Sequence, residues 1–142
     1  MERQYYLALF NEETWTQFLG QREIYGTTKK GITAANKINI GDFLICYVSK
    51  KSKFVGILEV VTKAYYDEQK IWEEGIFPVR IGIKIIIAHP LGKGLHISQF
   101  RQRLSLFEKL KNKDNWAGFF MRAFNRFEIN DGQIICEELI NV

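Results

Sequence analysis

Cysteine, histidine and proline are scarce in this chain, with two residues of each among 142. Two cysteines cannot form a disulfide framework, and since Cys46 and Cys136 each lie in an apolar run, we expect two buried, reduced thiols. A zinc site would need both cysteines together with His89 and His96, but these residues lack the close spacing that is typical of metal ligands. The sequence therefore predicts neither a metal nor a cofactor.

Long hydrophobic runs are missing as well. The apolar run from Tyr5 to Phe10 is too short for a secretion signal and far too short to cross a membrane. The longest nearly apolar stretch, residues 79–88, contains Arg80 and Lys84. We therefore expect a cytoplasmic protein without a membrane segment.

Known catalytic signatures are also lacking. No Gly-x-Gly-x-x-Gly motif follows an apolar strand, and no Gly-x-Ser-x-Gly elbow occurs. The stretch Gly92-Lys93-Gly94 lacks the leading glycine and the following Ser or Thr of a phosphate-binding loop. These absences argue against an enzyme. An enzyme of nucleotide or base modification nevertheless stays open as an alternative, as does a module that binds a small molecule or a protein.

The composition is that of a folded, soluble domain. Hydrophobic residues make up 46% and charged residues 25% of the chain, and its length leaves room for one hydrophobic core. We expect a single domain over residues 1–142. Aromatic residues reach 14%, and several lie at the expected ends of elements or in loops rather than on regular stripes, namely Tyr25, Tyr65, Tyr66, Trp72, Phe77 and Trp116. Aromatic side chains in such places either complete a core or stack on a ligand.

The net charge of +4 is distributed unevenly along the chain. Residues 27–63 contain seven lysines against two acidic residues, a net charge of +5. Residues 101–127 contain seven basic side chains against two acidic ones, again +5. If the two segments converge on one face, they form a surface for phosphates; otherwise they are two solvated faces.

Hydrophobic periodicity predicts about five strands and three or four helices in mixed order, which is typical of an α+β fold with a curled sheet. Alternating apolar residues make 79–88 the clearest strand. Asn11 is expected to cap a helix that ends at Gly20, and an apolar stripe from residue 97 to 110 predicts another helix. The remaining expected elements are a loop over 24–31, strands over 5–10, 43–49 and 54–65, a short helix over 33–37, and a final helix capped by Asn130 that ends near Ile140.

The strands over 43–49 and 54–65 are expected to form a hairpin, because only four residues separate them. Gly56 lies inside the second of these strands. A glycine in such a place indicates a bulge or a close approach of another part of the backbone.

The order of these segments resembles the EVE domain, a member of the PUA-like superfamily that is related to YTH and ASCH domains. The resemblance is carried by YYLALF, EETWTQFLG, IYGTTKKG and NIGDFLICYVSKKSKFVGILEVVTKAYYD in that order, followed by FPVRIGIKII and INDGQIICEELI. It covers nearly the whole chain. It implies a PUA-like curled mixed sheet, or pseudo-barrel, with flanking helices, and a domain that binds nucleic acid without catalysis.

The same arrangement is similar to the YTH domain, a reader of methylated adenine in RNA. In that domain an aromatic side chain after the first helix forms one wall of a cage, and IYGTT has Tyr25 at this place, where a Trp is usual. The resemblance implies a pocket for a flipped, modified base in RNA or DNA, with methylated adenine and methylated cytosine both open. The residues that it implies for the base pocket are Asn11, Tyr25, Gly26, Thr27, Tyr65, Asp67 and Trp72, with Tyr66 as an alternative for the second wall.

The resemblance also implies roles within that pocket. Asn11, Gly26 and Thr27 would form hydrogen bonds at the edge of the base, and Asp67 would accept one from an exocyclic amine. Basic side chains around the pocket are expected to hold phosphates without regard to sequence. These are Lys29, Lys30, Lys50, Lys51, Lys53 and Arg80.

Overall fold

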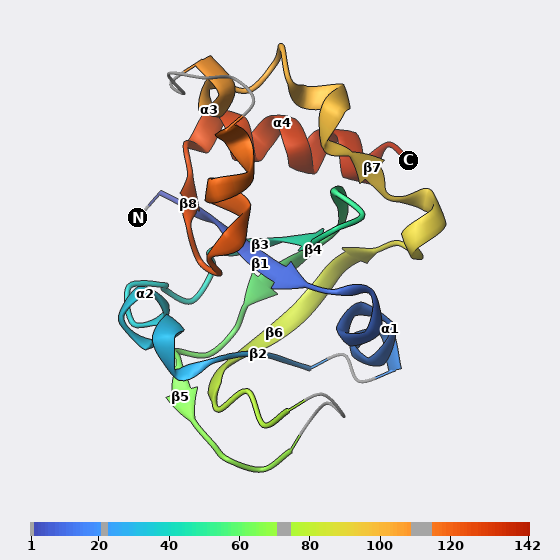
Figure 1. Ribbon diagram of the computed structural model, residues 1–142. Coiled ribbons are helices and arrows are strands. Elements are labelled where there is room, and N and C mark those ends of the chain that lie inside the picture. The colour runs from blue at the N-terminus through green and yellow to red at the C-terminus, as the bar shows by residue number, and fades with distance from the viewer. Residues whose placement is uncertain (1, 21–22, 71–74, 109–114) are drawn as a thin grey trace.

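The computed structural model describes residues 2–20, 23–70, 75–108 and 115–142, and Figure 1 shows a curled mixed sheet with helices on both of its faces. The strands are β1 (Tyr5–Phe10), β2 (Ile24–Thr27), β3 (Phe43–Val48), β4 (Lys53–Val60), β5 (Tyr65–Tyr66), β6 (Val79–Ala88), β7 (Leu95–His96) and β8 (Arg126–Phe127). The α-helices are α1 (Glu12–Gly20), α2 (Ile32–Ala35), α3 (Ser105–Glu108) and α4 (Ile129–Ile140). Four 3-10 segments join them: η1 (Lys29–Gly31), η2 (Leu91–Lys93), η3 (Ile97–Phe100) and η4 (Asn115–Met121).

The sheet follows the order β2-β6-β4-β3-β1-β8. The short strand β5 pairs with the first residues of β6, and β7 pairs with the first residues of β4. β1 and β3 are parallel, whereas the other pairs of neighbours are antiparallel. The sheet curls into a half-barrel with flanking helices (Figure 1), so the predicted α+β fold with a curled sheet is confirmed.

β1 shows why the sheet is covered on both faces. Tyr6, Ala8 and Phe10 point into one cluster of buried side chains, inside the half-barrel with α1, α2 and β2. Tyr5 and Leu7 point into a second cluster, under α4 and η4. Successive side chains of a strand point to opposite faces, and here each face has its own apolar core. This explains why the run YYLALF is apolar throughout.

Gly56 lies at the close backbone approach that its place in a strand predicts. The register between β3 and β4 shifts there, since Cys46 is paired with Gly56 and Tyr47 with Phe54. A Cβ atom on Gly56 would lie 2.8 Å from the carbonyl oxygen of Ile87 and 3.1 Å from the ring of Trp15. Both the irregular register and the close approach therefore occur at this residue, and the predicted hairpin of β3 and β4 is confirmed.

Three local predictions are wrong. Residues 24–27 form the edge strand β2 instead of a loop, because Tyr25 is buried and pairs with Ile81 of β6. The apolar stripe that begins at residue 97 is divided between η3 and α3, and the buried carboxylate of Asp131 accepts the N–H groups of Ser105 and Leu106 where α3 begins. Asn130 lies inside α4, whose N-cap residue Glu128 makes no side-chain cap.

Both cysteines are buried and unbonded, as predicted. Burial raises the pKa of Cys46 well above the ordinary value of 9.0 and raises the pKa of Cys136 to about 12. Both thiols therefore stay protonated at neutral pH, which is typical of structural rather than reactive cysteines.

Candidate functional site

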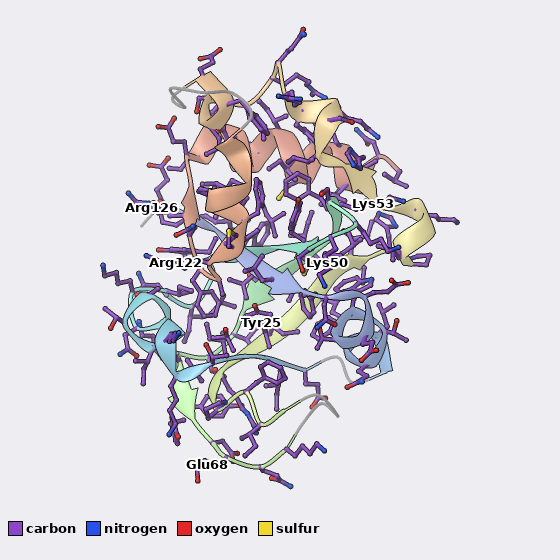
Figure 2. All side chains as sticks on the ribbon, in the orientation of Figure 1. Tyr25, Lys50, Lys53, Glu68, Arg122 and Arg126 are labelled. Carbon is purple, nitrogen blue, oxygen red and sulfur yellow. The ribbon has the colours of Figure 1, made fainter. Side chains whose placement is uncertain are left out.

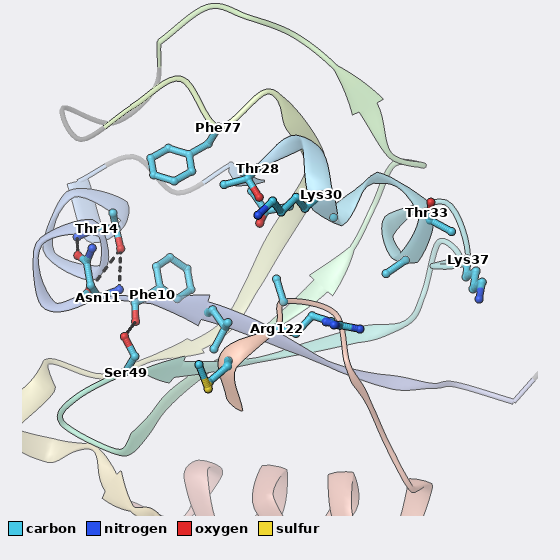
Figure 3. A pocket seen from close by; sticks show the side chains of 17 residues that line it. Phe10, Asn11, Thr14, Thr28, Lys30, Thr33, Lys37, Ser49, Phe77 and Arg122 are labelled. Carbon is cyan, nitrogen blue, oxygen red and sulfur yellow. Dashed lines mark hydrogen bonds between the residues drawn. The ribbon is translucent and has the colours of Figure 1, made fainter. Parts of the chain in front are cut away.

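A cavity of about 670 Å³ opens where β1 ends, between α1, η1 and the segment after η4 (Figure 3). Its volume lies within the range of about 300–1,000 Å³ that is usual for small-molecule sites. We call it the base cavity, because it lies where the resemblance of the sequence to the YTH domain predicts a base pocket. Its lining residues are Leu9, Phe10, Asn11, Thr14, Gly26, Thr27, Thr28, Lys30, Gly31, Thr33, Ala34, Lys37, Ser49, Phe77, Met121, Arg122 and Ala123.

The end of β1 and the start of α1 form one side of the base cavity. Asn11 follows β1 directly, and its Oδ1 accepts the backbone N–H of Thr14 at 2.8 Å, so it caps α1 as predicted. The Thr14 hydroxyl in turn accepts the N–H of Asn11 at 2.9 Å. These reciprocal bonds hold two polar side chains in place at the edge of the cavity.

Aromatic side chains contribute an apolar floor and a wall. Phe10 of β1 is only 3% exposed and lies at the floor. Phe77, from the loop before β6, is half-buried, and its ring lies above that of Phe10 in the view of Figure 3. Phe77 has a φ of 47°, a left-handed conformation that is rare for a bulky residue and needs support from its surroundings.

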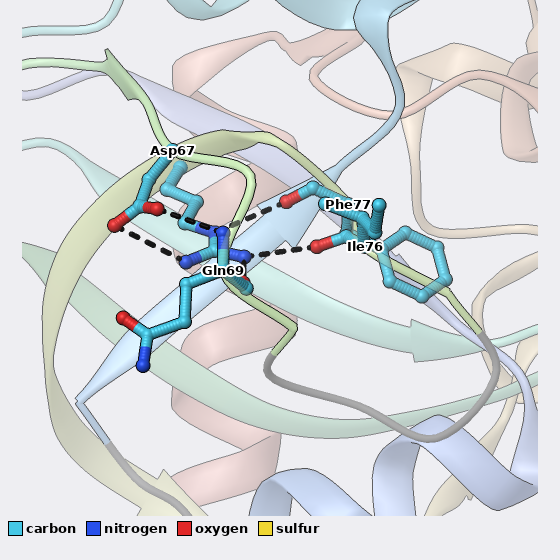
Figure 4. A network of polar contacts seen from close by, with 5 residues as sticks. Asp67, Gln69, Ile76 and Phe77 are labelled. Carbon is cyan, nitrogen blue, oxygen red and sulfur yellow. Dashed lines mark hydrogen bonds and ion pairs between the residues drawn. The ribbon is translucent and has the colours of Figure 1, made fainter.

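Arg80 provides that support (Figure 4). Its side chain is 2% exposed and lies 3.5 Å from a carboxylate oxygen of Asp67. Its Nε donates to the carbonyl oxygen of Phe77 at 3.2 Å, and a terminal nitrogen donates to the carbonyl oxygens of Gln69 and Ile76. One buried guanidinium thus binds the segment that follows β5, at Asp67 and Gln69, and also the segment that precedes β6, at Ile76 and Phe77.

All charged side chains among the described residues that line the base cavity are positive. Lys30, Lys37 and Arg122 line it, and no described lining residue is acidic. None of the three cations forms an ion pair with a carboxylate in the part of the chain that the structure covers. The cavity therefore attracts anions, and no carboxylate of the described residues neutralises its charge by an ion pair.

Tyr25 is not available as a wall, so this part of the predicted pocket is wrong. Its side chain is 1% exposed and packs against Phe10 and Phe124, with ring centroids 5.2 and 5.5 Å away. Its hydroxyl accepts the N–H of Leu9 at 2.8 Å and donates to the carbonyl oxygen of Leu9 at 3.0 Å. The hydroxyl thereby takes the place of a neighbouring strand beside β1 and closes the half-barrel. Burial raises the pKa of Tyr25 accordingly.

The other predicted pocket residues divide into three groups. Asn11, Gly26 and Thr27 do line the base cavity. Tyr65 lies on β5 and Asp67 holds Arg80, and neither lines the cavity. Trp72 lies outside the described residues.

Arg80 is the clearest error among the predicted phosphate ligands, because it is buried and bound to the loop that it holds. Lys30 lines the base cavity, whereas the Lys29 ammonium lies 5.9 Å from the centre of the Tyr66 ring. Lys50 and Lys51 line a neighbouring hollow beside α1, where Lys51 lies 3.7 Å from Glu12.

Lys53 donates to the carbonyl oxygen of Leu91 at 3.3 Å. In Figure 2 Lys50 and Lys53 lie to the right of Tyr25, whereas Arg122 and Arg126 lie to its left. In this view the hairpin lysines therefore lie on the other side of Tyr25 from these arginines.

Lys37, Met121 and Arg122 line the base cavity but were not among the residues expected from the sequence. Arg122 and Lys37 belong to the two basic segments, so the segment charges contained a signal for them. Phe77 was expected only as one of several aromatic residues at the ends of elements, because its place in the cavity depends on the buried Arg80 and on a left-handed backbone.

Two further features are absent from the described residues. No helix among them is both long and apolar enough to cross a membrane. No group of three or more His, Cys, Asp or Glu side chains there is arranged to hold a metal ion.

The fold defines a class of protein. The structure superimposes on the YTH domain of the Zygosaccharomyces rouxii MRB1 protein in complex with N6-methyladenosine RNA, with a TM-score of 0.72, 14% identity, and coverage of 97% of this chain and 87% of that one. The Pho92 YTH domain in complex with m6A gives a TM-score of 0.68 at 15% identity, covering 96% and 83%. The chain therefore has a YTH-like fold.

Within that class the sequence identifies the family. Residues 4–134 match the EVE domain. A UPF0310 protein of Pyrococcus abyssi is 26% identical over 144 residues, which cover 92% of this chain and 96% of that protein. This chain belongs to the EVE domain family, and the resemblance drawn from its sequence is confirmed.

Proposed function

We propose that this EVE domain binds single-stranded nucleic acid and takes one flipped, modified base into the base cavity, without catalysing a reaction on it. The observation that carries the proposal is the combination of an aromatic and apolar interior with three cations that form no ion pair with a described carboxylate, and with no described carboxylate in the lining. A base presents a flat apolar face attached to a negatively charged backbone, and this lining is complementary to both parts. RNA and DNA both present these features.

Contacts in the cavity offset the cost of taking a base out of its stack. Removing a base from its stack costs a few kcal/mol, and stacking on an aromatic side chain returns about 1–3 kcal/mol. A methyl group buried against the apolar floor adds about 0.8 kcal/mol. Selectivity among bases would come from the polar groups at the rim, because an unmatched buried donor or acceptor costs about 1–3 kcal/mol.

The hydroxyls available for that role lie around η1 and α2. Thr27, Thr28 and Thr33 line the base cavity, and their side chains form no hydrogen bond with the described part of the protein. A hydroxyl can both donate and accept, so these three can adapt to either edge of a base. Asn11 adds an amide group held in place by its capping bond.

The test is binding of fluorescent single-stranded RNA and DNA oligonucleotides, each with one unmodified, one methylated adenine or one methylated cytosine, at two salt concentrations. We expect one methylated oligonucleotide to bind about fourfold more tightly than its unmodified form, as a buried methyl group predicts. Phe77→Ala should remove that preference and lower affinity for the methylated oligonucleotide by about fivefold or more. Tyr65→Ala, which removes an aromatic side chain outside the cavity, is the matched control and should change neither.

Equal binding of all oligonucleotides, or a methyl preference that survives Phe77→Ala in a folded variant, would contradict the proposal. Because Phe77 is half-buried, circular dichroism must first show that the variant is folded. Lys30→Gln provides an independent check, since it leaves the aromatic wall intact. It should weaken binding of methylated and unmodified oligonucleotides equally and reduce the salt dependence.

A further inference from the structure

A second cavity, of about 880 Å³, adjoins the base cavity. The two share Ala34, Lys37 and Arg122, so these residues lie at the boundary between them. From this boundary the second cavity extends past β8 to the turn before β3 and the N-terminal end of β1. Its remaining lining residues are Glu2, Arg3, Gln4, Tyr6, Asn39, Ile40, Gly41, Asp42, Phe124, Asn125 and Arg126.

The cations of this second cavity are of two kinds. Arg3 is committed to the protein, because it donates to the carbonyl oxygen of Gly41 at 2.8 Å and lies 3.9 Å from the centre of the Phe43 ring. Lys37, Arg122 and Arg126 are exposed and form no ion pair with any carboxylate that the structure describes. Two of these three lie at the boundary, and the third lies farther from the base cavity.

The carboxylates of the second cavity do not neutralise these cations. Asp42 is 4% exposed, and its two oxygens accept the N–H groups of Gln4 and Asn39 at 3.0 and 2.9 Å. Glu2 is the other carboxylate in the lining and is exposed. The excess of charge thus remains positive, and it adjoins that of the base cavity at the shared residues Lys37 and Arg122.

We infer that the second cavity binds the nucleotide adjacent to the one whose base enters the base cavity, with the connecting phosphodiester held at the boundary by Lys37 and Arg122. This inference rests on the proposed function. Two adjoining cavities, with Lys37 and Arg122 at their boundary and Arg126 in the second, are complementary to consecutive nucleotides of a strand. An isolated phosphate would need only one cluster of cations.

The second cavity holds this nucleotide with little preference for its base. Each of its three side-chain amides makes a bond within the protein: Asn125 donates to the carbonyl oxygen of Phe119, Gln4 donates to that of Glu2, and Asn39 accepts from Lys63. Its floor is apolar, with the buried rings of Tyr6 and Phe124, and Ile40 is 64% exposed at its edge. Apolar contact and charge together tolerate any base.

The experiment compares three ligands on the intact chain: the preferred methylated nucleoside alone, and two pentanucleotides that carry the same base at the 5′ or the 3′ end. The two pentanucleotides extend in opposite directions, so only one of them can enter the second cavity. Arg126→Gln should weaken binding of one pentanucleotide by about two- to fivefold at low salt, as an exposed ion pair contributes. It should leave the other pentanucleotide and the nucleoside unchanged.

Further variants locate the effect. Lys37→Gln should weaken the same pentanucleotide, whereas Lys93→Gln, which removes an exposed lysine of η2 outside both cavities, should not. Each effective substitution should reduce the slope of log affinity against log salt by about 0.7. Changing the base next to the methylated one should have little effect.

The possible results separate the two hypotheses. If methyl-selective binding persists but Arg126→Gln and Lys37→Gln affect neither pentanucleotide, or affect both equally, the second cavity is not a nucleotide site and the base cavity stands. If neither the nucleoside nor any pentanucleotide binds selectively, the proposed function itself fails.

Discussion

Arg80 should contribute far more to the stability of the loop that carries Phe77 than Asp67, the carboxylate paired with Arg80. In the structure the Arg80 side chain is 2% exposed and donates to three carbonyl oxygens, whereas Asp67 is 44% exposed. A hydrogen bond from a charged donor contributes about 1.5–3 kcal/mol net, while an exposed ion pair contributes about 0–1 kcal/mol. The bonds to the carbonyl groups should therefore dominate.

Two substitutions separate these contributions. Arg80→Leu removes all the donors and leaves carbonyl groups without partners in the folded state. We expect it to lower the free energy of unfolding by about 2–4 kcal/mol, less than three full bonds, because the loop can open and rehydrate. Asp67→Asn keeps the bonds to the carbonyl groups and should cost less than about 1 kcal/mol.

Urea unfolding followed by circular dichroism measures the free energy of unfolding of both variants. The control is Lys84→Leu, on the exposed part of the same strand, whose free energy of unfolding should stay within about 0.5 kcal/mol of that of the parent. A loss for Asp67→Asn equal to that for Arg80→Leu would refute the reasoning, because the charge pair would then hold the loop. A negligible loss for Arg80→Leu would show that the network does not stabilise the fold.

Two further predictions concern the core. Gly56→Ala should lower the free energy of unfolding by about 1–3 kcal/mol in the same urea assay, because its Cβ would lie 2.8 Å from a backbone oxygen of Ile87; Gly92→Ala, with nothing within 4 Å, should be nearly neutral, and equal effects would refute the argument. For Cys136, burial raises the pKa from 9.0 to about 12, so the unfolded thiol ionises first and the free energy of unfolding falls as pH rises above about 9. Cys136→Ala should reduce this fall between pH 8 and 10.5, and an unchanged pH dependence would contradict it.

The parts of the fold that could be predicted are those whose signal is local. The strand over residues 79–88 was predicted from alternating apolar residues, and the cap of α1 from Asn11 and the residues next to it. The structure confirms both predictions. The edge strand β2 was predicted as a loop because its composition is polar and rich in glycine. Its pairing partner β6 lies more than fifty residues away, and no local pattern indicates that partner.

The candidate site was predictable only in part for a similar reason. Asn11, Gly26 and Thr27 line the cavity, and it was the resemblance to the YTH domain, not a local pattern, that implied them. Phe77 and Arg122 reach the cavity from segments distant in sequence, and their places depend on long-range contacts. Arg80 was misassigned, since charge alone does not distinguish a phosphate ligand from a buried clamp.

Tyr25 and Phe77 are connected by one structural requirement. The side of β1 that faces the opening of the half-barrel leaves the N–H and carbonyl groups of Leu9 without a neighbouring strand, and the Tyr25 hydroxyl satisfies both. An indole could donate but not accept, so a Trp at this position could not make the same pair of bonds. The aromatic ring that follows α1 is therefore used to close the sheet. The wall of the base cavity must then come from another segment, and in this chain it comes from the loop that Arg80 holds.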